Sequence, residues 1–62
     1  MFVIRRERGG DGEEPVSMWL KSAAPFMKWG DRATAMRFAT KGDARRTAGA
    51  IKLSGPWFVE AV

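Results

Sequence analysis

The pattern of apolar and polar residues predicts β-strands in two stretches of the first third of the chain, one rich in β-forming residues and one that alternates with a period of two. The first stretch is Phe2–Arg8, which begins with β-forming residues and becomes charged, and the second is Val16–Lys21, which alternates throughout. The glycine-rich segment between them, 9–12, predicts a hairpin turn. In this phase Leu20 lies on the core face, whereas Trp19 lies on the opposite face, where it needs a cover or a partner.

A helical period replaces the alternation in the second half of the chain. Thr40 is a natural N-cap, and Asp43, three residues later, meets the positive end of the helix dipole. Gly55 can adopt the left-handed conformation that closes a helix, and Pro56 cannot continue one. The expected helix is therefore Lys41–Ser54. Its apolar stripe is made of small residues, which allow close packing, namely Ala44, Thr47, Ala48 and Ile51.

Two shorter strands are expected around this helix. One is Ala35–Ala39, and the other is Pro56–Val62, whose phase keeps Glu60 in water and places Phe58 on the outside. The segment Ser22–Arg32 contains Phe, Met and Trp together with Pro and Gly, so we expect a loop. This loop either covers one face or edge of the sheet or forms an exposed recognition loop.

The element order β-β-β-α-β predicts an α+β fold: a small, mainly antiparallel sheet with one helix packed on one face. We expect a single domain, 1–62, with a small core. The expected core residues are Phe2, Ile4, Val16, Met18, Leu20, Phe38, Ala44, Ala48, Ile51, Trp57 and Val59.

The residue types present argue against catalysis. The chain has no Cys and no His, which excludes the common His- and Cys-based catalytic arrangements and a structural zinc site. Of the carboxylates, Asp43 is assigned to the helix cap, and Asp11, Glu13 and Glu14 to the turn between the first two strands. No pair of nucleophile and base can be named, so we expect no enzyme, no cofactor and no metal site.

Charge is unevenly distributed along the chain. The net charge is +4, with three acidic and no basic residues in 9–15, so the remainder of the chain is strongly basic. A basic body suits an anionic partner, although basicity alone speaks only to solubility and non-specific association. No apolar run is long enough to span a bilayer, and the N-terminus lacks a signal-peptide pattern. We therefore expect a cytoplasmic protein without a membrane partner.

Two surfaces are candidate contacts for a macromolecule. The outer face of the sheet, opposite the helix, is expected to show Arg5, Trp19, Lys21 and Phe58, and aromatic residues flanked by cations can stack bases and neutralise phosphates. The alternative is that the loop or a second copy of the chain covers these aromatic residues. Exposed sheet edges also favour a homodimer, formed face to face or by edge pairing.

The second surface is one flank of the helix. Lys41, Arg45 and Lys52 fall in a narrow band with Gly49 between them. This band is either a solvated helix face or a ridge that contacts phosphates, where Gly49 would let a backbone approach.

The segment that opens the helix carries a resemblance. Ala35, Phe38, Thr40 and Ala44 form the signature A-x-x-F-x-[ST]-x-x-x-A after a short strand. With the hairpin before it and the closing strand after it, the chain resembles small uncharacterised proteins of about 60–80 residues found in bacteria and phages. The resemblance carries over no assigned activity, catalytic residues or cofactor to this chain. Because no catalytic set can be named while apolar and basic groups are expected to be exposed, we expect a small, non-enzymatic domain that binds an unknown macromolecule or a second copy of itself. The alternative is a basic nucleic-acid-binding module.

Overall fold

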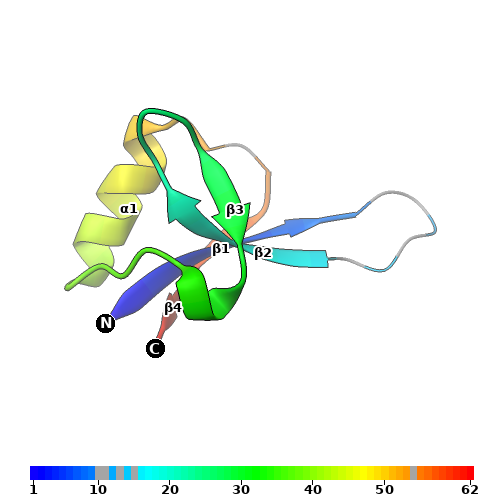
Figure 1. The fold of residues 1–62 in the computed structure, drawn as a ribbon, viewed down its shortest axis with the longest axis horizontal. Helices are drawn as coiled ribbons and strands as arrows, with labels where there is room; N and C mark the ends of the chain where they lie inside the picture. The colour runs from blue at the N-terminus through cyan, green and yellow to red at the C-terminus, as the bar shows by residue number, and fades with distance from the viewer. Residues whose placement is uncertain (10–11, 13, 15, 54) are drawn as a thin grey trace.

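The elements form one four-stranded antiparallel sheet with a helix on one face (Figure 1). The computed structural model describes residues 1–9, 12, 14, 16–53 and 55–62. The strand order is β3-β2-β1-β4, so β3 and β4 are the edges of this sheet. The predicted fold class is confirmed. The elements are β1 (Phe2–Arg8), β2 (Val16–Ser22), β3 (Lys28–Gly30), the 3-10 helix η1 (Arg32–Thr34), α1 (Lys41–Ala50) and β4 (Trp57–Ala61).

The third strand does not lie where the sequence predicts it. The prediction is Ala35–Ala39, but β3 is Lys28–Gly30, inside the segment expected to be a loop. In β3 Trp29 pairs with Leu20 of β2, and its ring packs against the core. Phe26 and Met27, which precede β3, are exposed, so they do not cover the sheet. The free energy gained when Trp29 packs against the core therefore exceeds the preference of the residues around it for a loop.

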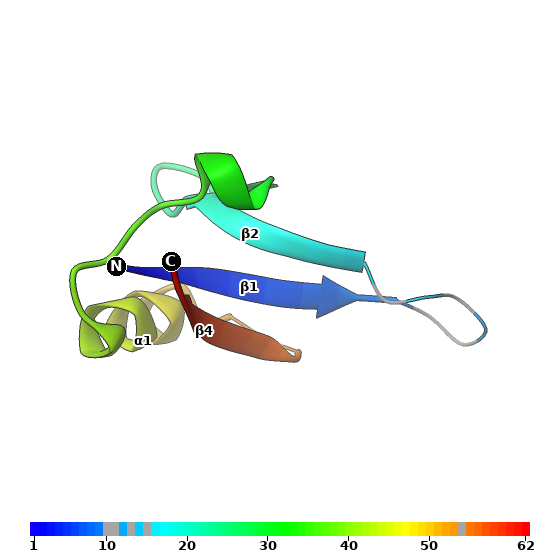
Figure 2. The same ribbon diagram turned by 90° about the horizontal axis from the view of Figure 1, so that it is seen from below.

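The segment 35–39, which is expected to be a strand, instead belongs to the linker from η1 to α1. This linker lies between the ends of β1 and β2 and is hydrogen-bonded to both. Phe2 and Phe38 exchange two backbone hydrogen bonds of 2.8 Å, and Met36 donates its N–H to the carbonyl of Leu20 at 2.8 Å. The pairing of β1 with β2 stops at Arg5 and Trp19, so the linker fills the gap beyond that point. Figure 2 shows it running from η1 past the N-terminus to α1.

Helix α1 starts as predicted but ends earlier. The backbone N–H of Asp43 donates to Oγ1 of the N-cap Thr40 at 3.1 Å. At the C-terminus, Lys52 rather than Gly55 is the left-handed residue that closes the helix, with a φ of 52° directly after the C-cap Ile51. Gly55 also has a positive φ, of 81°, but it lies three residues further along the chain. The N–H of Lys52 then donates to the carbonyl of Gly49, and that of Leu53 to the carbonyl of Ala48, which is a Schellman motif. The helix ends here because Leu53 turns back and packs against the core.

The left-handed conformation of Lys52 gives a first prediction. For a residue with a Cβ this conformation costs about 1–2 kcal/mol. A glycine removes that cost, but it also increases the conformational entropy of the unfolded chain, which offsets part of the gain. Lys52→Gly should therefore raise the free energy of unfolding by about 0.5–1 kcal/mol, measured by urea denaturation. Lys52→Ala removes the same charge without relieving the backbone and should give no gain. Equal effects of the two variants would contradict this explanation.

The core between sheet and helix is built on small helical residues. Ile4, Leu20 and Ala44 are fully buried, and Ala48 is nearly so. Because the helix presents two alanines, its axis can lie close to β1, whose side chains fill the space between them. The partly buried residues that pack against this cluster are Phe2, Ala23, Trp29, Met36, Phe38, Ile51, Leu53, Trp57 and Val59.

Two expected core residues of β2 lie outside this cluster. Val16 has 61% of its surface exposed, and Met18 is half-buried without joining the core. The ends of β1 and β2 where Arg8 pairs with Val16 extend well beyond the helix (Figure 1). The phase of β2 is therefore as predicted, but the helix is too short to cover its first residues.

The outer face is partly covered by η1 and the residue after it. Gly30 pairs with Trp19, so the two residues share the outer face, and a Cβ on Gly30 would lie 3.4 Å from Oγ1 of Thr34. Ala35, directly after η1, is buried, and Val3 of the outer face is fully buried. The cover of this face therefore comes from η1 and Ala35, of which only Arg32 belongs to the segment 22–32 that is expected to provide it.

Candidate functional site

The register of the sheet brings three predicted contact residues together on the outer face. Arg5 pairs with Trp19 of β2 on one side and with Phe58 of β4 on the other. Directly opposed residues point to the same face, so the predicted grouping of these side chains is correct in geometry. The guanidinium of Arg5 lies over the ring of Phe58, 4.7 Å from its centroid, in a cation–π contact.

Two carboxylates pair with the polar groups of Arg5 and Trp19 in this cluster. Glu7 accepts a hydrogen bond of 2.6 Å from Arg5, and Oε1 of Glu60 lies 3.4 Å from Nε of Arg5. The same Glu60 oxygen accepts a hydrogen bond of 2.9 Å from Nε1 of Trp19. The charge of Arg5 is thus compensated within the fold, and the carboxylates beside it repel phosphate. This arrangement favours a structural role for the outer-face cluster.

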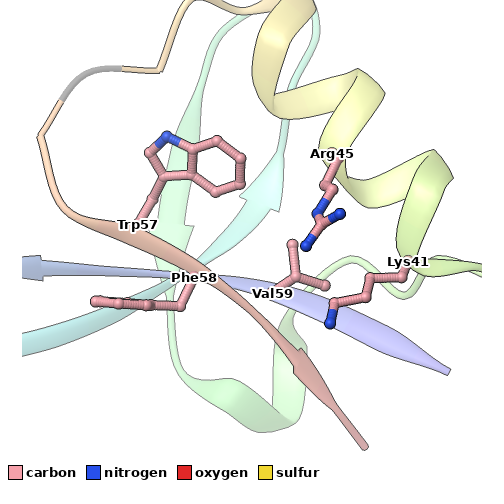
Figure 3. Close-up of a pocket in the computed structure, with 5 residues that line it drawn as sticks. All are labelled: Lys41, Arg45, Trp57, Phe58 and Val59. Atoms are coloured by element: carbon pink, nitrogen blue, oxygen red, sulfur yellow. The ribbon is translucent and has the colours of Figure 1, made fainter.

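A positively charged groove lies between β4 and α1, on the helix side of the sheet and therefore opposite the outer-face cluster (Figure 3). Its volume is about 330 Å³, and it is lined by Lys41 and Arg45 from the helix and by Trp57, Phe58 and Val59 from the strand. The i,i+4 spacing places both cations on one flank of α1. Figure 3 shows both side chains reaching from the helix toward β4, with Val59 between them and the strand.

A second hollow continues along the same strand toward the C-terminus. It is lined by Arg32, Ala33, Arg37, Ala61 and Val62, with a volume of about 610 Å³. A guanidinium nitrogen of Arg32 donates a hydrogen bond of 3.1 Å to the carbonyl of Ala61. Both hollows therefore have β4 as one wall. We call their four cations the basic margin of β4: Arg32, Arg37, Lys41 and Arg45.

The basic margin of β4 forms no ion pair within the described part of the chain. The pairs there join Arg5 to Glu7 and to Glu60, and Arg46 to Asp43. The margin is therefore a cluster of like charges held near one strand by three different segments of the chain. Such a cluster raises the local concentration of anions.

The predicted helix ridge is only partly reproduced. Lys41 and Arg45 line the groove, but Lys52 lies beyond the helix end and does not line it. A Cβ on Gly49 would meet nothing within 4 Å, so this glycine leaves its side of the helix open. Lys21 is exposed on the outer face, away from the groove lining.

The sequence predictions identify neither Trp57 and Val59 as residues that line the groove nor Arg32 and Arg37 as residues that line the second hollow. Arg32 and Arg37 lie in segments expected to be a loop and a strand, so nothing links them to β4. Trp57 and Val59 are correctly assigned to the helix side of the last strand, but as core residues. No pattern in the sequence identifies the groove, because it depends on a helix shorter than predicted and on the position of β4 at the edge of the sheet.

The described residues hold neither a membrane-spanning helix nor a cluster of metal ligands. No helix in this part of the chain has the length and apolar character needed to cross a membrane. Nor do these residues bring together three or more carboxylates in a way that could hold a metal ion. Asp11 and Glu13 of the predicted acidic turn, as well as Ser54 at the predicted helix end, lie outside the described residues.

Comparison of the chain with protein-family models, curated proteins and solved structures gave no match. The resemblance to small bacterial and phage proteins therefore stays a prediction. Each residue of its signature nevertheless has a role in this fold. Ala35 and Ala44 are buried, Phe38 pairs with Phe2, and Thr40 caps the helix.

Proposed function

We propose that this chain is a small, non-enzymatic binding domain that recognises an anionic macromolecule through the groove between α1 and β4. The observation that carries the proposal is the position of Lys41 and Arg45, which line one groove with Trp57, Phe58 and Val59. Within the described residues neither cation has an acidic partner. A groove that combines cations with aromatic and aliphatic surface suits an anionic polymer that also buries apolar groups.

Nucleic acid and an acidic polypeptide both supply this chemistry. Nucleic acid would place phosphates on the cations and a base against the apolar wall that Trp57 and Val59 form on the same side of β4. An acidic polypeptide would place carboxylates on the same cations. The two sources are separated by titrating the protein with a short single-stranded oligonucleotide and with an oligo-glutamate of equal charge.

Removing both groove cations should weaken binding of either polymer. For Lys41→Gln with Arg45→Gln, we expect an affinity about tenfold lower at low salt, which corresponds to about 1.4 kcal/mol. With the oligonucleotide, the slope of log affinity against log salt should fall by about two, because each of the two cations no longer neutralises a phosphate. Tryptophan fluorescence measures both quantities, because Trp57 lines the groove.

The matched control is Lys28→Gln with Arg46→Gln, which changes the net charge equally. Lys28 lies on the opposite edge strand and Arg46 elsewhere on α1, and neither lines the groove. The control variant should retain most of the affinity. Equal losses in the two variants would mean that the net charge, rather than the groove, determines binding, and the proposed site would be wrong.

Self-association by pairing of two β4 edges is disfavoured by the same charges. Such a dimer would bring the groove cations of one copy close to those of the other, and like charges at short range repel. Exposed apolar side chains elsewhere, such as Phe26 and Met27, leave other modes of self-association available. Sedimentation equilibrium at low and high salt tests this, since apolar association persists in salt whereas anion binding weakens.

A further inference from the structure

The free edge of β4 presents backbone groups to the groove. The N–H of Val62 donates to Met1, and the N–H of Glu7 donates to Pro56, so residues 56 and 62 turn their backbone groups toward β1. In an antiparallel pair this direction alternates, so 58 and 60 also face β1. Trp57, Val59 and Ala61 therefore turn their N–H and C=O groups away from the sheet.

Within the described residues, no strand pairs with this edge of β4. The guanidinium of Arg32 donates to the carbonyl of Ala61, at the end of the strand. The peptide groups of Trp57 and Val59, at the centre of the groove, have no such partner in the described part of the chain. These backbone groups can accept another strand, which would lengthen the sheet beneath α1.

The spacing of the groove cations matches the repeat of such a strand. Lys41 and Arg45, one helical turn apart, are separated by about 5–6 Å at their Cβ atoms. Side chains on one face of a strand recur every two residues, or about 6.6–6.8 Å. An added strand with acidic residues at alternate positions can therefore place successive carboxylates beside the two cations. Arg37 and Arg32 extend the positive charge beyond the far end of the same strand.

We propose that β4 and the α1 flank bind an extended acidic peptide as a fifth, antiparallel strand, a proposal that rests on the anionic-ligand function above. The remainder of the sheet is antiparallel, and antiparallel pairing is the more stable kind per residue. A peptide residue opposite Val59 points its side chain to the helix side and its N–H and C=O toward β4. Acidic residues of the peptide therefore make the backbone hydrogen bonds as well as the ion pairs.

Charge distinguishes this occupant from a second copy pairing through its own β4. A second β4 edge would add Lys41 and Arg45 of that copy to a site that is already positive, whereas an acidic strand neutralises it. Charge also distinguishes the peptide from a neutral strand, which would gain only backbone hydrogen bonds. The basic margin therefore serves both to select the peptide and to prevent edge-to-edge aggregation.

The experiment uses a soluble probe, the capped heptapeptide Thr-Glu-Thr-Glu-Thr-Glu-Thr, titrated into the ¹⁵N-labelled protein at low salt. Binding should slow amide hydrogen exchange at Val59 and Trp57, which face the groove. Phe58 and Glu60, which are already paired with β1, should change little and serve as an internal control. A probe with the same composition and three consecutive glutamates should bind at least fivefold more weakly.

Backbone methylation of the probe tests strand addition directly. N-methylation of its glutamates removes the donors that face β4 and should weaken binding at least tenfold. N-methylation of its threonines alters donors that face solvent and should change binding less than threefold. Lys41→Glu with Arg45→Glu should reverse the preference, so that a Thr-Lys probe of the same pattern binds better than the Thr-Glu probe.

The outcomes separate this inference from the proposed function. If the oligonucleotide binds in the groove and the peptide does not, the inference is wrong and the anionic-ligand function stands. If the peptide binds but both methylated probes bind equally well, the site takes an acidic peptide without strand addition, which also overturns the inference. If neither polymer binds at low salt, both proposals fail.

Discussion

Replacing Leu20 by alanine is expected to leave the protein largely unfolded at 25 °C. Leu20 is fully buried, pairs with Trp29 and belongs to the central cluster with Ile4 and the helix alanines. Removal of a buried leucine side chain costs about 2–5 kcal/mol. A core in a chain of this length rarely supplies more than about 3–5 kcal/mol in total. The loss is therefore comparable to the whole stability.

Circular dichroism and urea denaturation measure this effect, and Val16→Ala is its control. Both residues are apolar members of β2, and the alternation of the sequence predicts both in the core. Val16, however, is 61% exposed and lies beyond the helix, so its truncation should change the free energy of unfolding by about 0.5 kcal/mol or less. A folded Leu20→Ala variant with nearly unchanged stability would mean that this core does not hold the sheet and helix together.

The parts of the fold that the sequence predicts well are those determined by local chemistry. The alternation in Val16–Lys21 correctly assigns Leu20 to the core face and Trp19 to the outer face. The hydroxyl of Thr40 caps the helix start as expected. Phase and capping depend on neighbours within a few residues, so one sequence contains the information.

The predictions are wrong where contacts with distant parts of the chain determine the local structure. Trp29 lies in a strand because it pairs with Leu20 and because its ring packs against the core. The strand includes Gly30 because this residue pairs with Trp19, and a Cβ built on it would make ordinary van der Waals contacts with Thr34 and Lys21. The helix ends before Lys52 because Leu53 packs inward, and not because Gly55 follows. Each outcome depends on tertiary packing that propensities do not include.

The candidate site is predictable only in fragments for the same reason. The spacing of Lys41 and Arg45 is visible in the sequence, and so is the phase that turns Phe58 outward. Lys41, Arg45 and Phe58 come together at β4 only because that strand is at the edge of the sheet. The position of Arg32 and Arg37 at the end of β4 likewise depends on the strand order. That order comes from the pairing of β1 with both β2 and β4, which are far apart in the sequence, and no local pattern indicates it.

Glu60 gives the second large expected effect, because two neighbours depend on its carboxylate. In Glu60→Ala, the indole N–H of Trp19 loses its acceptor and the guanidinium of Arg5 loses one of its two carboxylates. A partly buried donor left without a partner costs about 1–3 kcal/mol. Since a third of the Glu60 side chain is exposed and water can replace part of the loss, we expect about 1–2 kcal/mol. Urea denaturation measures this change.

Glu60→Gln and Trp19→Phe separate the hydrogen bond from the charge. The amide oxygen of glutamine can still accept from the indole, so Glu60→Gln should cost less than Glu60→Ala. In Trp19→Phe the indole donor is absent, so a further Glu60→Ala change should cost about 1 kcal/mol less than in the native background. Additive effects would show that the 2.9 Å hydrogen bond contributes nothing to stability. A marked gain in oligonucleotide affinity in Glu60→Ala, persisting after removal of Lys41 and Arg45, would instead place anion binding on the outer face, because only there does Glu60 shield a cation.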